Sequence, residues 1–193
     1  MKKILKMNEN IYKCPKIGTI VPKMGHKEDI EKLFFENPSK EFYLREVSKL
    51  TKVPKTTVQR VLISLKNQNL INKLKTKPYE KYRANTENFY YKYYKKARMI
   101  EEIHKSGLMD YLIEKFNPNV IILFGSFAKG EYDIKSDIDL FLGSNESRID
   151  LNNYEKKLKH KINIIFEKNL GGLNTELRNN IVNGEKLYGF IKI

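Results

Sequence analysis

The chain has 193 residues, of which 37 are Lys or Arg and 23 are Asp or Glu, so its formal net charge is +14. This length allows one domain or two small ones, and the positive charge favours a polyanionic partner such as nucleic acid. No apolar run approaches the ~18 residues of a membrane-spanning helix, and a single cysteine, Cys14, excludes an intramolecular disulfide framework. We therefore expect a cytoplasmic protein with no signal peptide and no membrane partner.

The excess charge is concentrated in the middle of the chain. Residues 43–98 carry 15 basic and 3 acidic side chains, a net charge of +12, whereas residues 99–193 carry 13 basic and 14 acidic ones. A uniform abundance of lysine would not leave the second block balanced. The distribution therefore predicts two parts, a basic binding module followed by a near-neutral domain.

Three helices are the first predicted elements. Residues 1–26 contain Pro and Gly without periodicity, which indicates an irregular arm. Apolar residues at helical spacing predict a helix over 27–36, a short one over 43–50 with Leu50 on its inner side, and a third over 54–67. The third helix has a full apolar stripe, formed by Val58, Val61, Leu62 and Leu65.

A β-hairpin with a basic tip is expected next, because residues 70–83 form two short extended pieces around Lys77-Pro78-Tyr79. Since the apolar stripe of the third helix faces inward, its polar residues project outward, and Arg60 and Gln59 can make paired contacts to guanine or adenine. The residues expected to contact DNA are Lys55, Thr56, Thr57, Gln59 and Arg60 on the helix, with Lys73, Lys75 and Lys77 on the hairpin.

The order of three helices and a basic hairpin is that of a winged helix-turn-helix. Residues 43–71, YLREVSKLTKVPKTTVQRVLISLKNQNLI, resemble that family. The resemblance implies that the third helix lies in the major groove of double-stranded DNA. A winged helix used only for protein contacts is the alternative, and the +12 charge of residues 43–98 favours nucleic acid.

A long helix is expected over residues 86–105. Its aromatic arc consists of Phe89, Tyr93, Ala97 and Ile100 and is widened by Tyr90, Tyr91 and Tyr94. Such rings could stack on bases, but their helical spacing favours a buried stripe that joins the two parts. We therefore expect the tyrosines of this helix to be core residues.

Strand and helix patterns alternate in the rest of the chain, which predicts an α/β layer domain. Helices are expected over 108–116, 151–159 and 173–182, and strands over 120–124, 137–142, 162–166 and 186–191. The fold class is therefore α+β. An N-terminal winged helix-turn-helix (27–83) and a linker helix (84–106) precede an α/β domain with a small mixed sheet (107–193).

The candidate active site lies in residues 123–142, LFGSFAKGEYDIKSDIDLFL. Gly125-Ser126 follows a strand and would open a helix, which aims backbone N–H groups and a hydroxyl at phosphate. Asp137 and Asp139 lie two apart on the next strand and therefore share one face. Two such carboxylates beside a phosphate-binding turn indicate a Mg²⁺ site for phosphoryl or nucleotidyl transfer.

This pattern of Gly-Ser, a spacer and Asp-x-Asp resembles the minimal nucleotidyltransferases of the DNA polymerase β superfamily. The resemblance implies a polymerase-β-like fold in which Gly125, Ser126 and Lys129 hold the phosphates of a nucleoside triphosphate, with ATP favoured. It implies that Asp137 and Asp139 bind Mg²⁺ and are catalytic. Some members of this family modify partner proteins of toxin–antitoxin pairs, so a toxin is a candidate acceptor.

One position departs from the family pattern, because Asn163 stands where the family has a third acidic residue. An amide is a weak Mg²⁺ ligand and cannot accept the proton of an attacking hydroxyl. Glu167 lies ~13 Å further along the strand, too far to replace it. Two functions stay open. One is a DNA-binding nucleotidyltransferase, which the motif favours, and the other is a transcription regulator with an inactive nucleotide-sensing domain.

Overall fold

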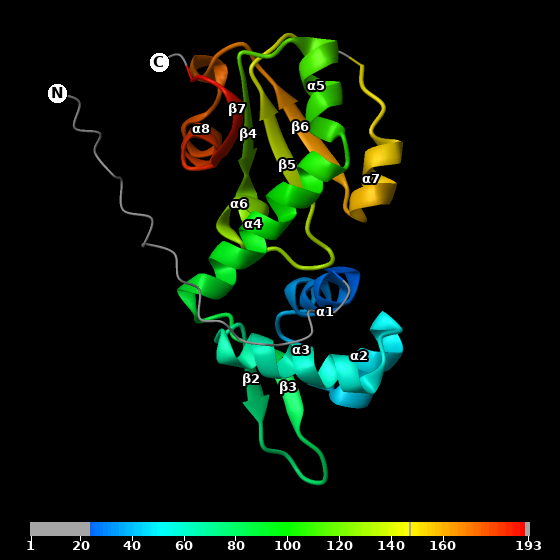
Figure 1. The fold of residues 1–193 in the computed structure, drawn as a ribbon. Helices are drawn as coiled ribbons and strands as arrows, with labels where there is room; N and C mark the ends of the chain where they lie inside the picture. Colours follow the sequence, from blue (N-terminus) through cyan, green and yellow to red (C-terminus); the bar gives the residue numbers. More distant parts are fainter. Residues whose placement is uncertain (1–23, 147, 192–193) are drawn as a thin grey trace, which may run out of the picture.

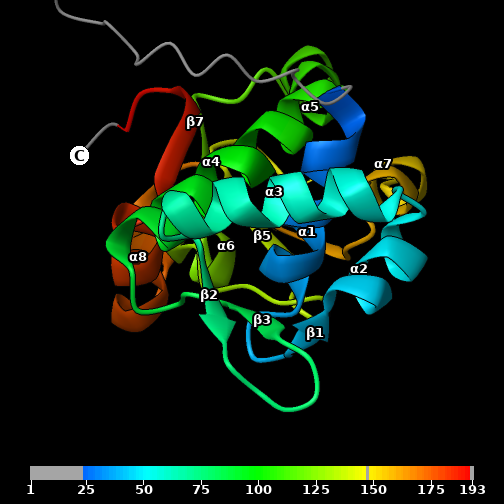
Figure 2. The same cartoon turned by 60° about the horizontal axis from the view of Figure 1, so that its bottom comes forward.

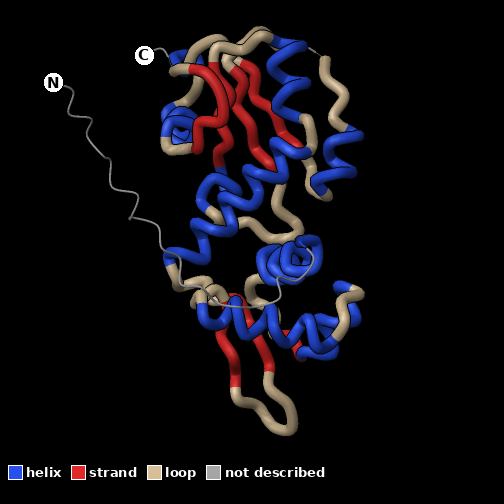
Figure 3. Tube along the Cα trace, viewed as in Figure 1, coloured by secondary structure: helices blue, strands red, loops and turns tan. Residues whose placement is uncertain are grey.

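The computed structural model describes residues 24–146 and 148–191, in which two sheets are joined by one long helix (Figure 1). A three-stranded sheet lies among the first helices, and a four-stranded sheet lies in the second half of the chain. Figure 3 shows the strands gathered in these two places with helices between them. Within the described residues, no helix is both long and apolar enough to span a membrane.

The N-terminal part has the predicted order of helices followed by a hairpin. Its elements are α1 (Met24–Glu36), β1 (Phe42–Tyr43), α2 (Leu44–Thr51), α3 (Lys55–Asn67), β2 (Ile71–Leu74) and β3 (Lys81–Ala84). The hairpin is confirmed, because β2 and β3 pair antiparallel with Ile71 opposite Ala84. The sequence did not predict β1, which pairs with the other edge of β3, because two residues show no periodicity.

The apolar stripe of α3 is buried as predicted, and it forms one core with α1 and the small sheet. Two expectations for the flanking helices are wrong. Helix α1 begins at Met24, inside the stretch expected to be an irregular arm, whose residues 1–23 lie outside the described ones. Leu50 is 52% exposed, because Val53, just after α2, fills a core position instead.

Helix α4 (Phe89–Lys105) joins the two parts, but its buried face is not the predicted one. The buried residues are Tyr91, Lys95, Met99 and Ile103, one at every fourth position. Phe89, Tyr90, Tyr93 and Tyr94 are instead 76, 64, 55 and 42% exposed. The expectation of an aromatic core is therefore confirmed for Tyr91 and wrong for these four residues, because the buried stripe continues from Tyr91 through Lys95.

The C-terminal part is a four-stranded mixed sheet with the strand order β6-β5-β4-β7. Its elements are α5 (Leu108–Phe116), β4 (Val120–Phe124), α6 (Gly125–Lys129), β5 (Ile138–Leu142), α7 (Asn152–Leu158), β6 (Ile162–Phe166), η1 (Leu170–Gly172), α8 (Thr175–Val182) and β7 (Glu185–Gly189). Strands β5 and β6 are parallel, and the other two pairs are antiparallel. The predicted α+β class is confirmed.

Each face of the larger sheet has its own core. Ile121 and Leu123 of β4 pack with α5 and the end of α4, whereas Ile122 packs with Ile181 of α8 on the opposite face (Figure 1). Residues of β5 alternate in the same way, with Leu140 on the α5 face. Asp139 therefore lies on the α8 face of the sheet.

Candidate functional site

The candidate carboxylates lie at the edge of the larger sheet where β4 ends and β5 begins. Phe124, the last residue of β4, pairs with Asp139, and Gly125 follows at once as the first residue of α6. Asp137 precedes β5 and is exposed, Asp139 is half-buried, and Ile138 between them is fully buried. The structure therefore brings Gly125 and both carboxylates together beside α6, which contacts the ends of β4 and β5.

Gly125 allows the backbone to approach the Asp139 carboxylate closely. Its φ is +71°, a left-handed conformation that side chains with a Cβ adopt at a cost. A Cβ built on Gly125 would lie 2.6 Å from Oδ2 of Asp139. Both the conformation and the space therefore require glycine beside the carboxylate.

Asn163 lies within the same cluster. It is opposite Asp139 in the parallel ladder of β5 and β6. Its Nδ2 donates hydrogen bonds to Oδ1 of Asp139 at 3.1 Å and to Oδ2 of Asp137 at 3.4 Å. The amide therefore links the two carboxylates without adding charge, at the position where a third carboxylate was expected.

Glu167 lies at the other end of β6, which runs from Ile162 to Phe166. Its Oε1 accepts a hydrogen bond from the N–H of Lys168, and its carboxylate lies near Gly172 in η1. Because Asn163 is at the start of β6 and Glu167 follows its end, Glu167 does not join the carboxylate pair. The expectation that Glu167 is too far away agrees with this placement.

A magnesium ion fits the donor set of this edge. Proteins commonly hold Mg²⁺ through one or two carboxylates and complete its shell with water and substrate phosphates. Asn163 bonds only one oxygen of each carboxylate, so Oδ1 of Asp137 and Oδ2 of Asp139 lie outside its two hydrogen bonds. Over residues 24–146 and 148–191, no group of three His, Cys, Asp or Glu could hold a metal. Water and phosphate oxygens would therefore complete the shell.

The two other residues expected at phosphate lie on α6. Ser126 is half-buried in the first turn, and Lys129 is exposed at the end of the helix. Glu131 follows α6, and its pKa is lowered chiefly by a hydrogen bond from Lys92, with a smaller contribution from the charge of Lys129. The phosphate contacts of Ser126 and Lys129 stay predictions.

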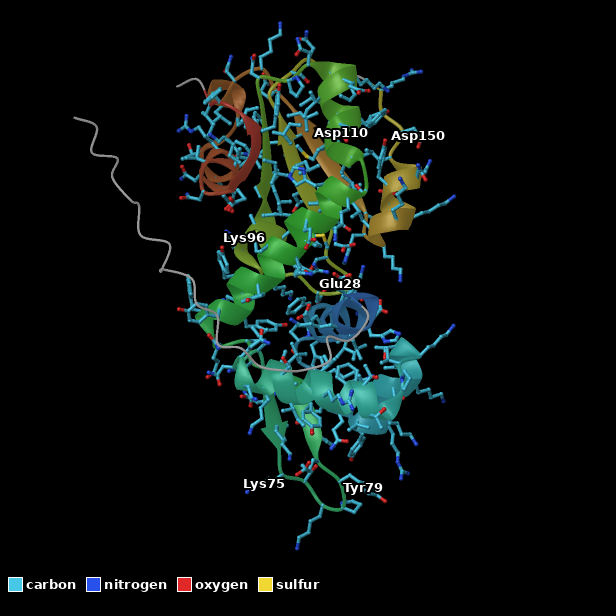
Figure 4. The ribbon with its side chains drawn as sticks, in the orientation of Figure 1. Glu28, Lys75, Tyr79, Lys96, Asp110 and Asp150 are labelled. Atoms are coloured by element: carbon cyan, nitrogen blue, oxygen red, sulfur yellow. The ribbon has the colours of Figure 1, made fainter. Side chains whose placement is uncertain are left out.

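The second candidate site is the outer side of α3, which crosses the front of Figure 2, with the hairpin wing below it. Lys55, Thr56, Gln59 and Arg60 are exposed along this helix, and Thr57 is half-buried. Figure 4 shows Lys75 and Tyr79 at the end of the wing furthest from the larger sheet. The exposed residues Lys75 and Lys77 thus extend the basic surface of α3.

Lys73 behaves differently from the other wing lysines. Its Nζ pairs with Glu80 at 2.7 Å across the hairpin, and this hydrogen bond raises the pKa of Lys73. Lys81 likewise pairs with Glu41 at 3.0 Å. Both cations would have to exchange a carboxylate for a phosphate on binding DNA, so we expect Lys75 and Lys77 to contribute more to the affinity.

Sequence reasoning missed a contact between the wing and α2. Tyr43, Arg45, Tyr79 and Tyr82 line a pocket between them, and the Arg45 guanidinium lies 5.7 Å from the centre of the Tyr79 ring. This cation–π contact supports the wing. Only the pairing of β1 with β3 brings these residues together, and the sequence gives no signal for β1.

Comparison with known proteins finds a family-model match for a stretch in each of the two parts. Residues 106–189 match the family described as "Polymerase beta, Nucleotidyltransferase", and residues 39–86 match "Sugar-specific transcriptional regulator TrmB". None of the curated proteins and none of the solved structures compared with the chain matches it. The resemblance stated from the sequence is confirmed. The chain combines a regulator-type helix-turn-helix domain with a nucleotidyltransferase-like domain.

Proposed function

We propose that the protein is a DNA-binding regulator whose nucleotidyltransferase-like domain binds Mg²⁺ with a nucleoside triphosphate, preferably ATP, and does not transfer the nucleotide. The observation that carries this proposal is the amide of Asn163, which donates to both Asp137 and Asp139. A carboxylate at residue 163 could accept the proton of an attacking hydroxyl, whereas the amide group cannot. The site therefore retains its binding groups, and residue 163 supplies no base.

Each residue has a defined part in this proposal. Asp137 and Asp139 hold the cation through the oxygens that Asn163 does not bond, and Ser126 and Lys129 contact the phosphates. When bound, the cation offsets the negative charge of the triphosphate. Gly125 lets the backbone lie against Asp139, because its φ is +71° and any Cβ at this position would lie 2.6 Å from Oδ2 of Asp139.

The DNA-binding half of the proposal rests on the match to a regulator family and on the exposed basic side of α3 and the wing. Its partner is double-stranded DNA, with α3 in the major groove. We place the protein in the cytoplasm. We place the limits of the linker and the second domain at residues 84–106 and 107–193, and we begin the first domain at Met24, where α1 begins.

A second candidate is nucleotidyl transfer to a partner protein such as a toxin. It is favoured by the Gly125-Ser126 turn and the Asp pair, which both lie at the same sheet edge. This activity requires the acceptor hydroxyl to lose its proton to a group other than residue 163. It is therefore the less favoured of the two.

Titration calorimetry of ATP into the full chain tests the proposal. We expect binding that requires Mg²⁺ and weakens at least about tenfold in Asp139→Asn, which corresponds to ~1.4 kcal/mol. Asp110→Asn is the matched control, because Asp110 is an exposed carboxylate on α5 of the same domain (Figure 4). Absence of Mg²⁺-dependent binding to the wild type, or equal binding to Asp139→Asn, contradicts the proposal.

A further inference from the structure

The buried face of α4 carries one cation between two hydrophobic cores. Tyr91 belongs to the core of the N-terminal part, whereas Met99 and Ile103 belong to the core under the larger sheet. Lys95 lies between them on the same face and is 1% exposed. Burying an ammonium group is costly, and an apolar side chain of similar length would pack there at lower cost. The contacts of Lys95 therefore indicate what the lysine does.

Lys95 contacts the segment that leads to the carboxylates, residues 130–136, which we call the junction loop. Its Nζ donates to the backbone carbonyl of Tyr132 and lies 4.2 Å from the centre of the Tyr132 ring. The Tyr132 hydroxyl donates in return to the carbonyl of Lys95 at 3.3 Å. Because the loop ends immediately before Asp137, Lys95 anchors the chain segment that positions this carboxylate.

The junction loop is also tied to the N-terminal part. The N–H of Ile134 donates to the carbonyl of Glu36, the last residue of α1, at 2.9 Å. Glu131 pairs with Lys92 of α4 at 2.6 Å. One loop therefore contacts α1, contacts α4 and continues into the Asp pair.

Clefts lie on both sides of this connection. One of about 260 Å³ is lined by residues that include Glu28 and Arg98, and it reaches Tyr132; Glu28 is labelled on α1 in Figure 4. Another of about 290 Å³ is lined by residues that include Pro38, Lys95 and Glu131. The two hydrophobic cores of the described residues contain no common residue, and α4 and the polar contacts of the junction loop connect them. Such a connection can shift without opening either core.

We propose that Lys95 and the junction loop couple the two sites, so that Mg²⁺ and nucleotide bound at Asp137 and Asp139 change the affinity of the winged helix for DNA. The inference rests on the proposed function and specifies how the nucleotide site regulates DNA binding. Asp137 and Asp139 would hold the cation, and because the junction loop ends at Asp137, a displacement of this carboxylate would reach α1 through Ile134 and α4 through Lys95. By linkage, DNA must change the affinity for the nucleotide by the same factor.

The test measures binding of a fluorescent mixed-sequence duplex of about 24 base pairs at about 50 mM salt. Mg²⁺ is present throughout, and the dissociation constant is compared with and without ATP. We expect ATP to change it at least about fivefold in the wild type. We expect less than about a twofold change in Lys95→Met, although that variant binds duplex and ATP separately. Lys105→Met, a surface lysine at the end of α4, should keep the wild-type response.

Three further arms make the result decisive. Asp139→Asn reports any effect of ATP that does not pass through the site. Tyr132→Phe, which removes only the hydroxyl bond to the Lys95 carbonyl, should reduce the response and replaces Lys95→Met if the latter does not fold. Hydrogen exchange of the wild type should show ATP-dependent protection at Ile134.

An equal response of DNA affinity to ATP in wild type and Lys95→Met overturns the coupling and leaves the proposed function standing. ATP binding in calorimetry without any effect on DNA affinity has the same meaning. Absence of ATP binding in calorimetry overturns both.

Discussion

Lys95 shows how one buried side chain makes stability depend on pH. Burial lowers its pKa from 10.5 to about 8, although the charges of Asp133, Glu131 and Glu36 oppose the shift and Lys92 adds to it. Between these two values the unfolded chain binds a proton that the native chain has lost, so the native state becomes more stable as pH rises. Below pH 8 the Lys95 amine is protonated in both the native and the unfolded state, so the native state bears the full free-energy cost of burying the ammonium group.

We therefore expect Lys95→Met to be more stable than the wild type at pH 7 and to lose much of that advantage by pH 10. The difference between the unfolding free energies of Lys95→Met and the wild type, measured in urea at several pH values, should shrink by up to ~3 kcal/mol between pH 7 and pH 10. Burial also raises the pKa of the phenols of Tyr91 and Tyr132, but both proteins contain them, so their effect cancels in the comparison. If the unfolding free energies of the two proteins instead change with pH in parallel, burial of the Lys95 ammonium group does not destabilise the native state.

Gly125→Ala tests the close approach of backbone and carboxylate. The new Cβ needs a left-handed conformation and would lie 2.6 Å from Asp139 Oδ2, so the side chain of Asp139 must move. We expect a loss of ~1–2 kcal/mol in unfolding free energy from the conformation alone, together with weaker Mg²⁺-dependent ATP binding. Gly25→Ala is the control, because its Cβ would meet nothing within 4 Å. Unchanged ATP binding in Gly125→Ala would place the site elsewhere.

Asn163→Asp tests the missing acid. A third carboxylate beside Asp137 and Asp139 replaces two hydrogen bonds by repulsion, so we expect a lower melting temperature without metal. Mg²⁺ should then raise the melting temperature of the variant more than that of the wild type, because it binds the native state. Asn180→Asp, an exposed change on α8, should show no such gain. Equal Mg²⁺ responses in wild type and Asn163→Asp would contradict the assignment of residue 163 to the site.

At the scale of elements, periodic apolar patterns predicted α3 and the strands of the larger sheet, because these segments bury one face or both. The same alternation predicted that Asp137 and Asp139 share one face, and the family resemblance predicted that Asn163 lies beside them. The buried face of α4 could not be found in this way, because Lys95 is a core residue only through its contacts with the junction loop. The contact of Arg45 with Tyr79 likewise depends on strand pairing that joins distant segments.

The third helix and the wing should affect DNA binding differently. Arg60 is exposed on α3, where it would read bases, so Arg60→Ala should blur the preference between sequences at a cost of ~1–3 kcal/mol. Charge reversal at Lys75 and Lys77 should weaken binding to all duplexes alike. It should also make the plot of log K against log salt less steep, because each phosphate contact contributes about −0.9 to its slope. Affinity measured over a salt series with several duplexes separates the two effects. A wing variant that changes sequence preference would contradict this division.

At the scale of the whole molecule, the protein joins a basic module to a near-neutral domain through one long helix and one loop. The +12 charge of residues 43–98 lies mainly in the helix-turn-helix part, and the carboxylate pair lies at the sheet edge next to the junction. This arrangement suits a regulator whose nucleotide site lies close to the connection with its DNA-binding part. The exposed aromatic residues of α4 lie on the same connecting helix.

The absence of nucleotidyl transfer is tested by incubating the full chain with Mg²⁺ and ATP labelled at the α-phosphate and counting the label before and after denaturation. We expect the native wild type to retain the label and to lose it on denaturation, and we expect no label on the Asp137→Asn, Asp139→Asn double variant. The opposite result is label that stays covalently attached to the chain or to an added acceptor protein after denaturation and that requires the two aspartates. It would contradict the proposed function and establish a transferase.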